Sequence, residues 1–198
     1  MADETDQAFI FDLDGTLADT MPVHFGVWQI IAERHGLVFP EERFYALGGV
    51  PTHRIAATLI AEQGLPLDPA RITAEKERAF LDRFGEVGPV TAVVEIAREA
   101  RAEGPIAVAT GSPRAIAERT LRQLGILDWF AVLVGAEDTA RHKPDPDVFL
   151  EAARRLGVEP RACTVYEDTD LGLEAARRAG MAAVDVRPLV LGCRGSGR

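Results

Sequence analysis

AFIFDLDGT, at residues 8–16, is the stretch of this chain from which its fold can be inferred. Its first four residues are apolar without alternation, which is typical of a strand that helices cover on both faces of a parallel sheet. Asp12 stands where that strand should end, at the edge where open α/β sheets bind their ligands. Asp14 follows two positions later, and Gly15 allows the backbone to turn sharply or to approach a ligand closely.

Asp12 and Asp14 can be interpreted chemically or as a simple turn. Two neighbouring carboxylates repel each other unless a cation or a proton lies between them, and Mg²⁺ with oxygen ligands meets that need. An aspartate can also act as a nucleophile and form an aspartyl-phosphate. We therefore interpret Asp12 as a candidate nucleophile and Asp14 as a candidate general acid/base beside a Mg²⁺ ion. The alternative is a strand-end turn in which Asp14 and Gly15 serve only as turn residues.

The composition is that of an ordinary globular protein. The 198 residues are 47% hydrophobic and 27% charged, which allows one sizeable core with a small inserted lobe. A net charge of −9 argues against nonspecific binding to nucleic acid or to an anionic membrane surface. The first residues lack the apolar segment of a signal peptide, and no apolar run has the length of a membrane span. We expect a cytoplasmic monomer that acts on a small molecule, with Cys163 and Cys193 reduced.

Hydrophobic periodicity divides the chain into a helical block and an alternating block. Four helices are predicted after the first strand, at 21–35, 41–47, 53–63 and 70–84, with Thr52 as a cap of the third. From residue 88 onward we predict helices at 91–102, 113–124, 146–156 and 171–179, and strands at 106–110, 131–134, 162–166 and 182–186. The last residues, 192–198, are rich in glycine and are expected to be loose.

This alternation predicts a doubly wound parallel α/β core with an inserted helical cap. The core comprises residues 1–19 and 86–198, and the cap comprises residues 20–85. The first strand should be central, with the strands near Ile106 and Ala162 on either side of it.

Another predicted strand ends at Thr110, Gly111 and Ser112, where the chain enters a helix. Hydroxyls and backbone N–H groups at the start of a helix can hold an anion. The simpler alternative is that Ser112 caps the helix and Pro113 is its first residue.

Lys143 lies in a basic loop that Pro144 and Pro146 stiffen. A lysine at this place could neutralise both a nucleophilic carboxylate and a phosphoryl group. The alternative is a solvated basic turn before a helix.

Glu167 and Asp168 follow the predicted strand at 162–166, and three acids lie within residues 167–170. Acids so close together destabilise one another without a counter-ion, and a Mg²⁺ ion shared with Asp12 and Asp14 would supply it. The alternative is that Asp168 or a neighbouring threonine caps the next helix. Because the ends of parallel strands share one edge of a sheet, the joint pattern is more specific than any single motif.

These motifs together resemble those of the haloacid dehalogenase superfamily, in the branch with a helical cap after the first motif. The resemblance covers roughly residues 8–187 and includes DLDGT at 12–16, Thr110, Lys143 and EDTDLGLEAA at 167–176. It implies that Asp12 is the nucleophile and that Asp14 is the general acid/base, with Thr110 and Lys143 as further catalytic residues. It also implies that Mg²⁺ is held by the Asp12 side chain, the Asp14 main-chain carbonyl and Asp168, with Glu167 nearby.

A closer resemblance is to bacterial phosphatases of the fructose-1-phosphate and 6-phosphogluconate type, with the β-phosphoglucomutases as neighbours. It is carried by GVPTHRIA at 49–56, HKP at 142–144 and AGMAAVDVR at 179–187. His24 and Lys76 resemble a hinge-and-cap pair of the mutase, whose phosphate-gripping cap arginine is replaced here by Thr52. The residues with an implied role in substrate binding are Gly111, Ser112, His24, Thr52, Arg54 and Lys76.

We therefore expect a Mg²⁺-dependent phosphatase of small sugar phosphates. Three alternatives remain open: a phosphomutase, a dehalogenase and a noncatalytic protein that binds a phosphometabolite. A dehalogenase needs no metal, which would leave Glu167 and Asp168 without a purpose. A binding protein would not need Asp14.

Overall fold

The computed structural model describes residues 7–48 and 50–189. Two compact units are present: the first ends at Asp19 and resumes at Gly88, and the second spans Thr20–Val87. We call the first the α/β unit and the second the helical unit. Within the described residues, no helix has both the length and the apolar character that crossing a membrane requires.

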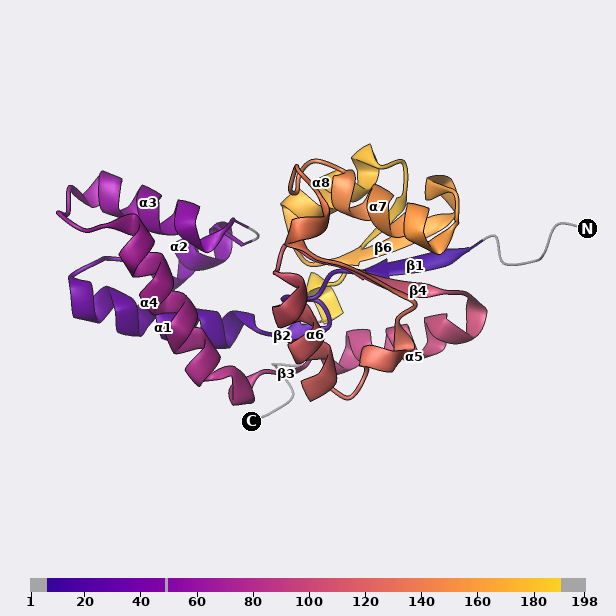
Figure 1. The fold of residues 1–198 in the computed structure, drawn as a ribbon, viewed down its shortest axis with the longest axis horizontal. Helices are drawn as coiled ribbons and strands as arrows, with labels where there is room; N and C mark the ends of the chain where they lie inside the picture. Colours follow the sequence, from indigo (N-terminus) through magenta and orange to yellow (C-terminus); the bar gives the residue numbers. More distant parts are fainter. Residues whose placement is uncertain (1–6, 49, 190–198) are drawn as a thin grey trace, which may run out of the picture. The chain divides into compact units, whose positions relative to one another are not determined.

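The α/β unit is built on a five-stranded parallel sheet (Figure 1). In spatial order the strands are β5 (Val132–Val134), β4 (Ile106–Ala109), β1 (Ala8–Phe11), β6 (Cys163–Glu167) and β7 (Ala182–Asp185). The prediction that the first strand is central is therefore confirmed. Phe11 pairs with Val108 on β4 and with Tyr166 on β6, so the carboxyl ends of these three strands are level.

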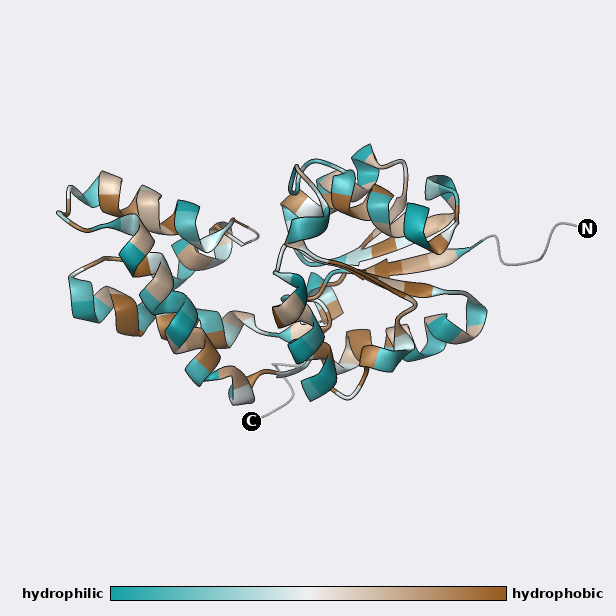
Figure 2. Cartoon of the chain, viewed as in Figure 1, coloured by the Kyte–Doolittle hydropathy of each residue, from teal (hydrophilic) through white to brown (hydrophobic). Residues whose placement is uncertain are grey.

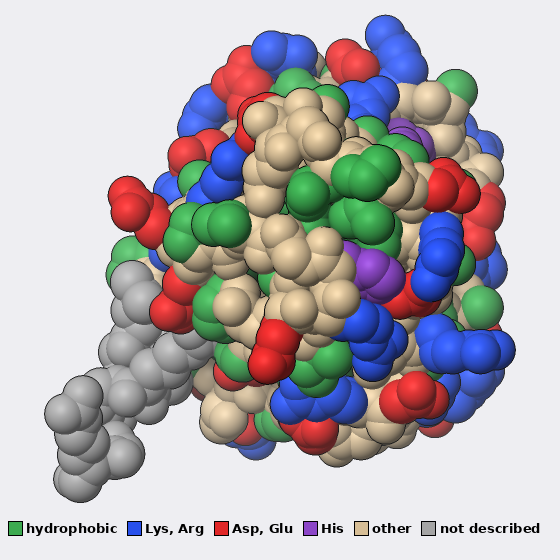
Figure 3. Space-filling model, turned by 90° about the vertical axis from the view of Figure 1, so that its left-hand side faces the viewer, with side chains coloured by type: hydrophobic (Ala, Val, Ile, Leu, Met, Phe, Trp, Pro, Cys, Tyr) green, Lys and Arg blue, Asp and Glu red, His purple; other side chains and the backbone are tan. Residues whose placement is uncertain are grey.

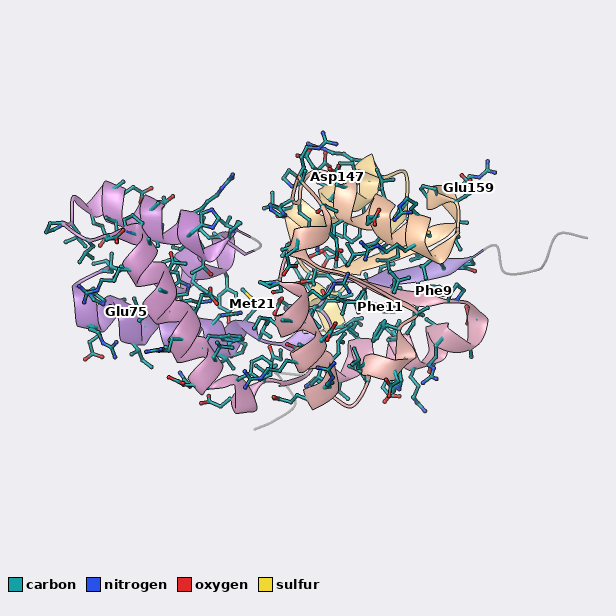
Figure 4. The ribbon with its side chains drawn as sticks, viewed as in Figure 1. Phe9, Phe11, Met21, Glu75, Asp147 and Glu159 are labelled. Atoms are coloured by element: carbon teal, nitrogen blue, oxygen red, sulfur yellow. The ribbon has the colours of Figure 1, made fainter. Side chains whose placement is uncertain are left out.

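Helices cover both faces of this sheet, which explains why the strands β1 and β4 are apolar throughout. In Figure 1, α7 (Asp147–Leu156) and α8 (Asp170–Arg178) lie on one face, and α5 (Thr91–Glu103) and α6 (Arg114–Gln123) lie on the other. Figure 2 shows the same layering, with largely brown strands between helices that carry both teal and brown residues. Ile10, Val165 and Phe149 are fully buried between the sheet and α7 and α8, and Phe9 and Phe11 can be found on β1 in Figure 4.

The helical unit consists of α1 (Met21–His35), α2 (Glu41–Ala46), α3 (Thr52–Gln63) and α4 (Pro69–Asp82). Helix α4 packs against α1 and α3. Aromatic rings pack in its interior: Trp28 and Phe39 meet edge to face with ring centres 5.3 Å apart, and Phe80 and Phe84 do so at 5.8 Å. On the face of the molecule drawn in Figure 3, acidic and basic side chains are interspersed.

Most predicted elements are present within one or two residues of their expected bounds, but several local predictions were wrong. Thr52 does not cap α3; it is the first residue of that helix, and its hydroxyl donates to Glu77. Ser112 does not cap α6 either, because α6 begins at Arg114 and has no side-chain cap. The predicted helix at 70–84 is α4 followed by a separate 3-10 turn at Phe84–Glu86.

Other features of the chain fall outside what periodicity can find. A two-residue antiparallel ribbon, β2 (Ala18–Asp19) with β3 (Gly88–Pro89), is too short to give a pattern. Cys163 is a buried free thiol, whereas Cys193 and the predicted loose tail at 192–198 lie outside the described residues.

The core makes a direct prediction about stability. Phe149 is fully buried on α7, whereas Leu150, the next residue, is 37% exposed. Phe149→Ala should lower the free energy of unfolding by about 3–5 kcal/mol, because it leaves a cavity between helix and sheet. Leu150→Ala is the matched control and should cost less than about 1 kcal/mol. Urea unfolding measures both, and equal losses would contradict this description of the core.

Candidate active site

The structure brings four predicted segments together at the carboxyl edge of the sheet in the α/β unit. Asp12 follows β1, Thr110 follows β4, and Glu167 is the last residue of β6. Lys143 reaches the same place from the loop before α7. Residues far apart in sequence therefore share hydrogen bonds here, as Asp12 and Lys143 do across 131 positions.

Lys143 is the central cation of this site. Its Nζ lies 2.6 Å from Asp12 Oδ1 and 2.6 Å from Glu167 Oε2, and 4.9 Å from the centre of the Phe149 ring. Burial alone would lower the pKa of this ammonium, but the charges and hydrogen bonds of Asp12 and Glu167 outweigh it and raise the pKa. These two carboxylates therefore favour the charged form of Lys143. The alternative of a solvated basic turn was wrong for this residue.

The loop that carries Lys143 is closed by its neighbours. The Arg141 guanidinium donates two hydrogen bonds to the carboxylate of Asp147, at 3.0 and 2.8 Å. Asp147 is the first residue of α7 and is labelled in Figure 4. The peptide bond between Lys143 and Pro144 is cis. Arg141 thus holds the loop at its base while Lys143 points to the carboxylates.

Three carboxylates surround this single lysine. Asp12, Glu167 and Asp168 each offer an oxygen atom within 4.8 Å of the others. Burial, followed by the charge of Glu167, raises the pKa of Asp168 to about 7 and raises the pKa of Asp12 well above its ordinary value. One ammonium does not balance three acids, and a cluster of carboxylate oxygens is the donor set that Mg²⁺ prefers. These residues therefore fit a hard divalent cation.

The three acids differ in how many oxygen atoms they can offer to a cation. Oε1 of Glu167 already accepts hydrogen bonds from the N–H of Asp168 and from the N–H and hydroxyl of Thr169, and Oε2 accepts from Lys143. Lys143 occupies one oxygen of Asp12, and the Thr16 hydroxyl occupies one oxygen of Asp168 at 2.9 Å. The second oxygens of Asp12 and Asp168 lie outside these bonds, so these two carboxylates are the better candidates for metal ligands.

Two glycines make this close packing possible. A Cβ atom on Gly172 would lie 2.0 Å from the Glu167 carboxylate carbon, and one on Gly15 would lie 2.3 Å from Asp168 Oδ2. Gly15 also has φ +90, a conformation that side chains rarely adopt. Glycine in the DLDGT motif is thus required by the approach of the second acidic cluster to the first. Sequence reasoning missed Gly172 and the Thr16 hydroxyl, although both lie inside the motifs that were quoted.

The carboxylate of Asp14 accepts hydrogen bonds from residues that follow β4. The Ser112 hydroxyl donates to Asp14 Oδ2 at 2.6 Å, and the Thr110 hydroxyl lies 3.5 Å from the same atom. Ser112 N–H donates to Thr110 Oγ1 at 3.0 Å. Gly111, between them, is exposed. The interpretation of Ser112 as a helix cap therefore gives way to a contact with the candidate acid/base.

The helical unit contains its own buried polar cluster. Lys76 Nζ lies 3.0 Å from His24 Nδ1, 3.4 Å from Thr52 Oγ1 and 3.2 Å from Glu77 Oε1. His24 stacks on the Phe80 ring at 4.0 Å, and burial, followed by the charge of Lys76, lowers its pKa to about 3.

The structure therefore brings together three of the four cap residues named from the sequence. Arg54 is exposed on α3 and does not join these hydrogen bonds. Glu77, which accepts from both Lys76 and Thr52, was missed. The sequence could have suggested Glu77, because it directly follows Lys76.

Comparison with known proteins places this geometry among hydrolases. Residues 7–180 match the model of the haloacid dehalogenase-like hydrolase family. The chain is 42% identical to the fructose-1-phosphate phosphatase YqaB of Escherichia coli, over 91% of this chain and 96% of that protein. It is 32% identical to a phosphorylated carbohydrates phosphatase of Thermotoga maritima, over 90% and 83% of the two chains. Among solved structures, a β-phosphoglucomutase of Clostridium difficile superposes with a TM-score of 0.79 at 25% identity, covering 90% of this chain and 83% of that one.

The raised pKa of Asp168 predicts how stability depends on pH in the metal-free protein. The folded state keeps a proton up to about pH 7 that the unfolded chain releases near pH 4. The free energy of unfolding should therefore fall by a few kcal/mol as pH rises from about 4 to about 7. Urea unfolding in EDTA measures this, and Asp168→Asn should show a smaller fall than wild type, with the part due to the raised pKa of Asp12 remaining. If the free energy of unfolding of Asp168→Asn depended on pH in the same way as that of wild type does, the proposed environment of Asp168 would be contradicted.

Proposed function

The chain belongs to the haloacid dehalogenase-like hydrolases, and from this membership and the geometry of the acidic site we propose that it is a Mg²⁺-dependent phosphatase of small sugar phosphates. It is a phosphoric monoester hydrolase, like the phosphatases to which it is similar. The observation that carries the proposal is the contact of Lys143 with Asp12, 2.6 Å long, at the edge of the sheet. A buried carboxylate beside an ammonium whose charged form is favoured suits an attack on a dianionic phosphoryl group.

In the first step, Asp12 attacks phosphorus and the bond between phosphorus and the sugar oxygen breaks. The leaving oxygen takes a proton from Asp14, which begins the step protonated, and the product is an aspartyl-phosphate with a free sugar alcohol. In the second step, water attacks the same phosphorus and gives a proton to Asp14. Inorganic phosphate leaves, Asp12 is restored, and Asp14 carries its proton again.

Other residues supply charge and hydrogen bonds to these steps. Lys143 already neutralises Asp12 and, in this proposal, also binds the phosphoryl oxygens, to which Thr110 and the backbone of Gly111 contribute further donors. Asp12, Asp168 and the main-chain carbonyl of Asp14 would hold Mg²⁺, with Glu167 beside them. When bound, the ion would offset the negative charge that develops on the phosphoryl oxygens.

We propose sugar phosphates as substrates because the relatives are named for them. The Escherichia coli relative is named for fructose 1-phosphate and the Thermotoga relative for phosphorylated carbohydrates. We further propose that the helical unit is the cap domain, and that its cluster of His24, Thr52 and Lys76, together with Arg54, sets selectivity for the sugar. We also propose a cytoplasmic monomer, and the net charge of −9 disfavours nonspecific binding to nucleic acid or to an anionic membrane surface.

A specific observation favours a phosphatase over a mutase. A mutase must hold a second phosphate, for which a cation is the suitable group. Thr52 stands at the corresponding position, and its hydroxyl donates to the carboxylate of Glu77 at 2.7 Å. That carboxylate also accepts from Lys76 and so offsets its charge. A pair of opposite charges suits neutral hydroxyl groups better than a second phosphate.

The experiment measures phosphate release from fructose 1-phosphate and from p-nitrophenyl phosphate by the purified protein. We expect turnover with Mg²⁺ and loss of turnover in EDTA. Asp12→Asn should lower kcat by roughly a thousandfold or more, since it removes the nucleophile without changing the shape of the side chain. Circular dichroism should show that the variant remains folded.

Two results would contradict the proposal. Asp12→Asn activity within tenfold of wild type would remove Asp12 as the nucleophile. Rapid formation of glucose 6-phosphate from β-glucose 1-phosphate, primed by a trace of the 1,6-bisphosphate and faster than phosphate release, would identify a mutase instead.

A further inference from the structure

The Ser112 hydroxyl is committed to Asp14. At 2.6 Å, its hydrogen bond to Asp14 Oδ2 has the length of a strong bond to a carboxyl oxygen. Ser112 was expected to bind substrate or to cap α6; it does not cap α6, and its hydroxyl donates to Asp14 instead. Helix α6 begins only at Arg114 and has no side-chain cap, so the Ser112 hydroxyl is not used as a helix cap.

The backbone of Ser112 is fixed on both sides. Its N–H donates to Thr110 Oγ1 at 3.0 Å, and its carbonyl accepts from the Ala136 N–H at 3.0 Å. Thr110 is in turn tied to β5, because its N–H donates to the Val134 carbonyl. The hydroxyl of Ser112 is thus presented by two adjacent strand ends and is a rigid donor.

The backbone of Asp14 is fixed as well, but its side chain depends on β4. The Leu13 carbonyl accepts from the N–H groups of Thr16, Leu17 and Ala18, and Gly15 N–H donates to Ala18, so the loop is closed on itself. The hydrogen bonds of the Asp14 carboxyl that the structure describes come from Ser112 and, at 3.5 Å, from Thr110, and both reach Oδ2. Oδ1 is the oxygen left to exchange a proton.

We propose that Ser112 is a positioning residue that orients the general acid Asp14 for protonation of the leaving oxygen. A donor fixed at Oδ2 makes that atom the acceptor of the carboxyl group, so the transferable proton is carried on Oδ1. When the bond between phosphorus and the leaving oxygen breaks, the proton passes from Oδ1 to that oxygen, and the Ser112 hydroxyl stabilises the carboxylate that remains. The inference rests on the proposed phosphatase function. It gives Ser112 the role of orienting Asp14, which differs from binding a phosphoryl oxygen.

Leaving-group dependence separates this role from the others. Proton donation matters little for p-nitrophenol, which departs readily as an anion, and matters greatly for an unsubstituted phenol. A series of substituted phenyl phosphates keeps the shape of the substrate constant and contains no sugar hydroxyls. The parameter kcat/KM reports the step in which the phenol departs.

We expect Ser112→Ala to lower kcat/KM for phenyl phosphate by about tenfold or more, part of what a general acid contributes, and to leave p-nitrophenyl phosphate within about twofold. In wild type, kcat/KM should depend only weakly on how readily the phenol leaves. Ser112→Thr keeps the hydroxyl and should retain this weak dependence, whereas Ser112→Cys, with a weak donor, should not. Thr73→Ala is the matched control, because the bond that the described residues show for the Thr73 hydroxyl goes to the Pro69 carbonyl of its own helix. Its leaving-group dependence should equal that of wild type.

The outcomes distinguish the inference from the function on which it rests. Equal loss for every ester would make Ser112 a phosphoryl ligand and overturn the inference alone. No loss for any ester would show that Asp14 is oriented without Ser112 and would overturn it too. A wild-type protein that hydrolyses none of the esters would overturn the proposed function and this inference with it. Thermal unfolding of each variant guards against a loss of folded protein.

Discussion

The ion pairs of Lys143 with Asp12 and Glu167 are the interaction on which the rest of the site depends. Three carboxylates, those of Asp12, Glu167 and Asp168, converge where the neighbouring strands β1 and β6 end. Their mutual repulsion in a buried setting would oppose folding unless a cation or a proton lies among them. Lys143 supplies one positive charge at 2.6 Å from two of the acids. The charge that remains unbalanced is what makes the site suited to a divalent metal.

The architecture around this interaction is rigid on each side. Glu167 is fixed by the Asp168 and Thr169 N–H groups and by the close approach of Gly172, so it can hold Lys143 in one place. The Arg141 and Asp147 pair closes the loop from the other end. Pre-organised charge of this kind is worth more to catalysis than mobile charge, because it need not rearrange as the reaction proceeds. The fold therefore contributes to the chemistry by holding opposite charges where water would otherwise separate them.

The sequence predicted the fold and the site well where a pattern had a single physical cause. The apolar run at 8–11 could only be a covered strand, and its observed bounds are those expected. The strand-end acids and Lys143 could be placed together because parallel strands end at one edge. Predictions failed where a polar side chain could form a hydrogen bond either with a neighbour in sequence or with a distant residue. Ser112 could cap a helix or reach Asp14, and Thr52 could cap α3 or reach Glu77, and in both cases a residue distant in sequence was the partner. Local pattern holds no information about such partners, and the same is true of the contact between Gly172 and Glu167.

The account as a whole requires that Asp12 become phosphorylated during turnover. The most direct measurement is to mix the protein with Mg²⁺ and a sugar phosphate, quench at early times with sodium borohydride, and digest for peptide mass analysis. Borohydride reduces an acyl phosphate to an alcohol, so the account predicts homoserine at position 12, in the peptide that contains residues 8–16, and only when substrate is present. Unmodified Asp12 during rapid turnover, or a phosphoryl group trapped on another side chain, would contradict it.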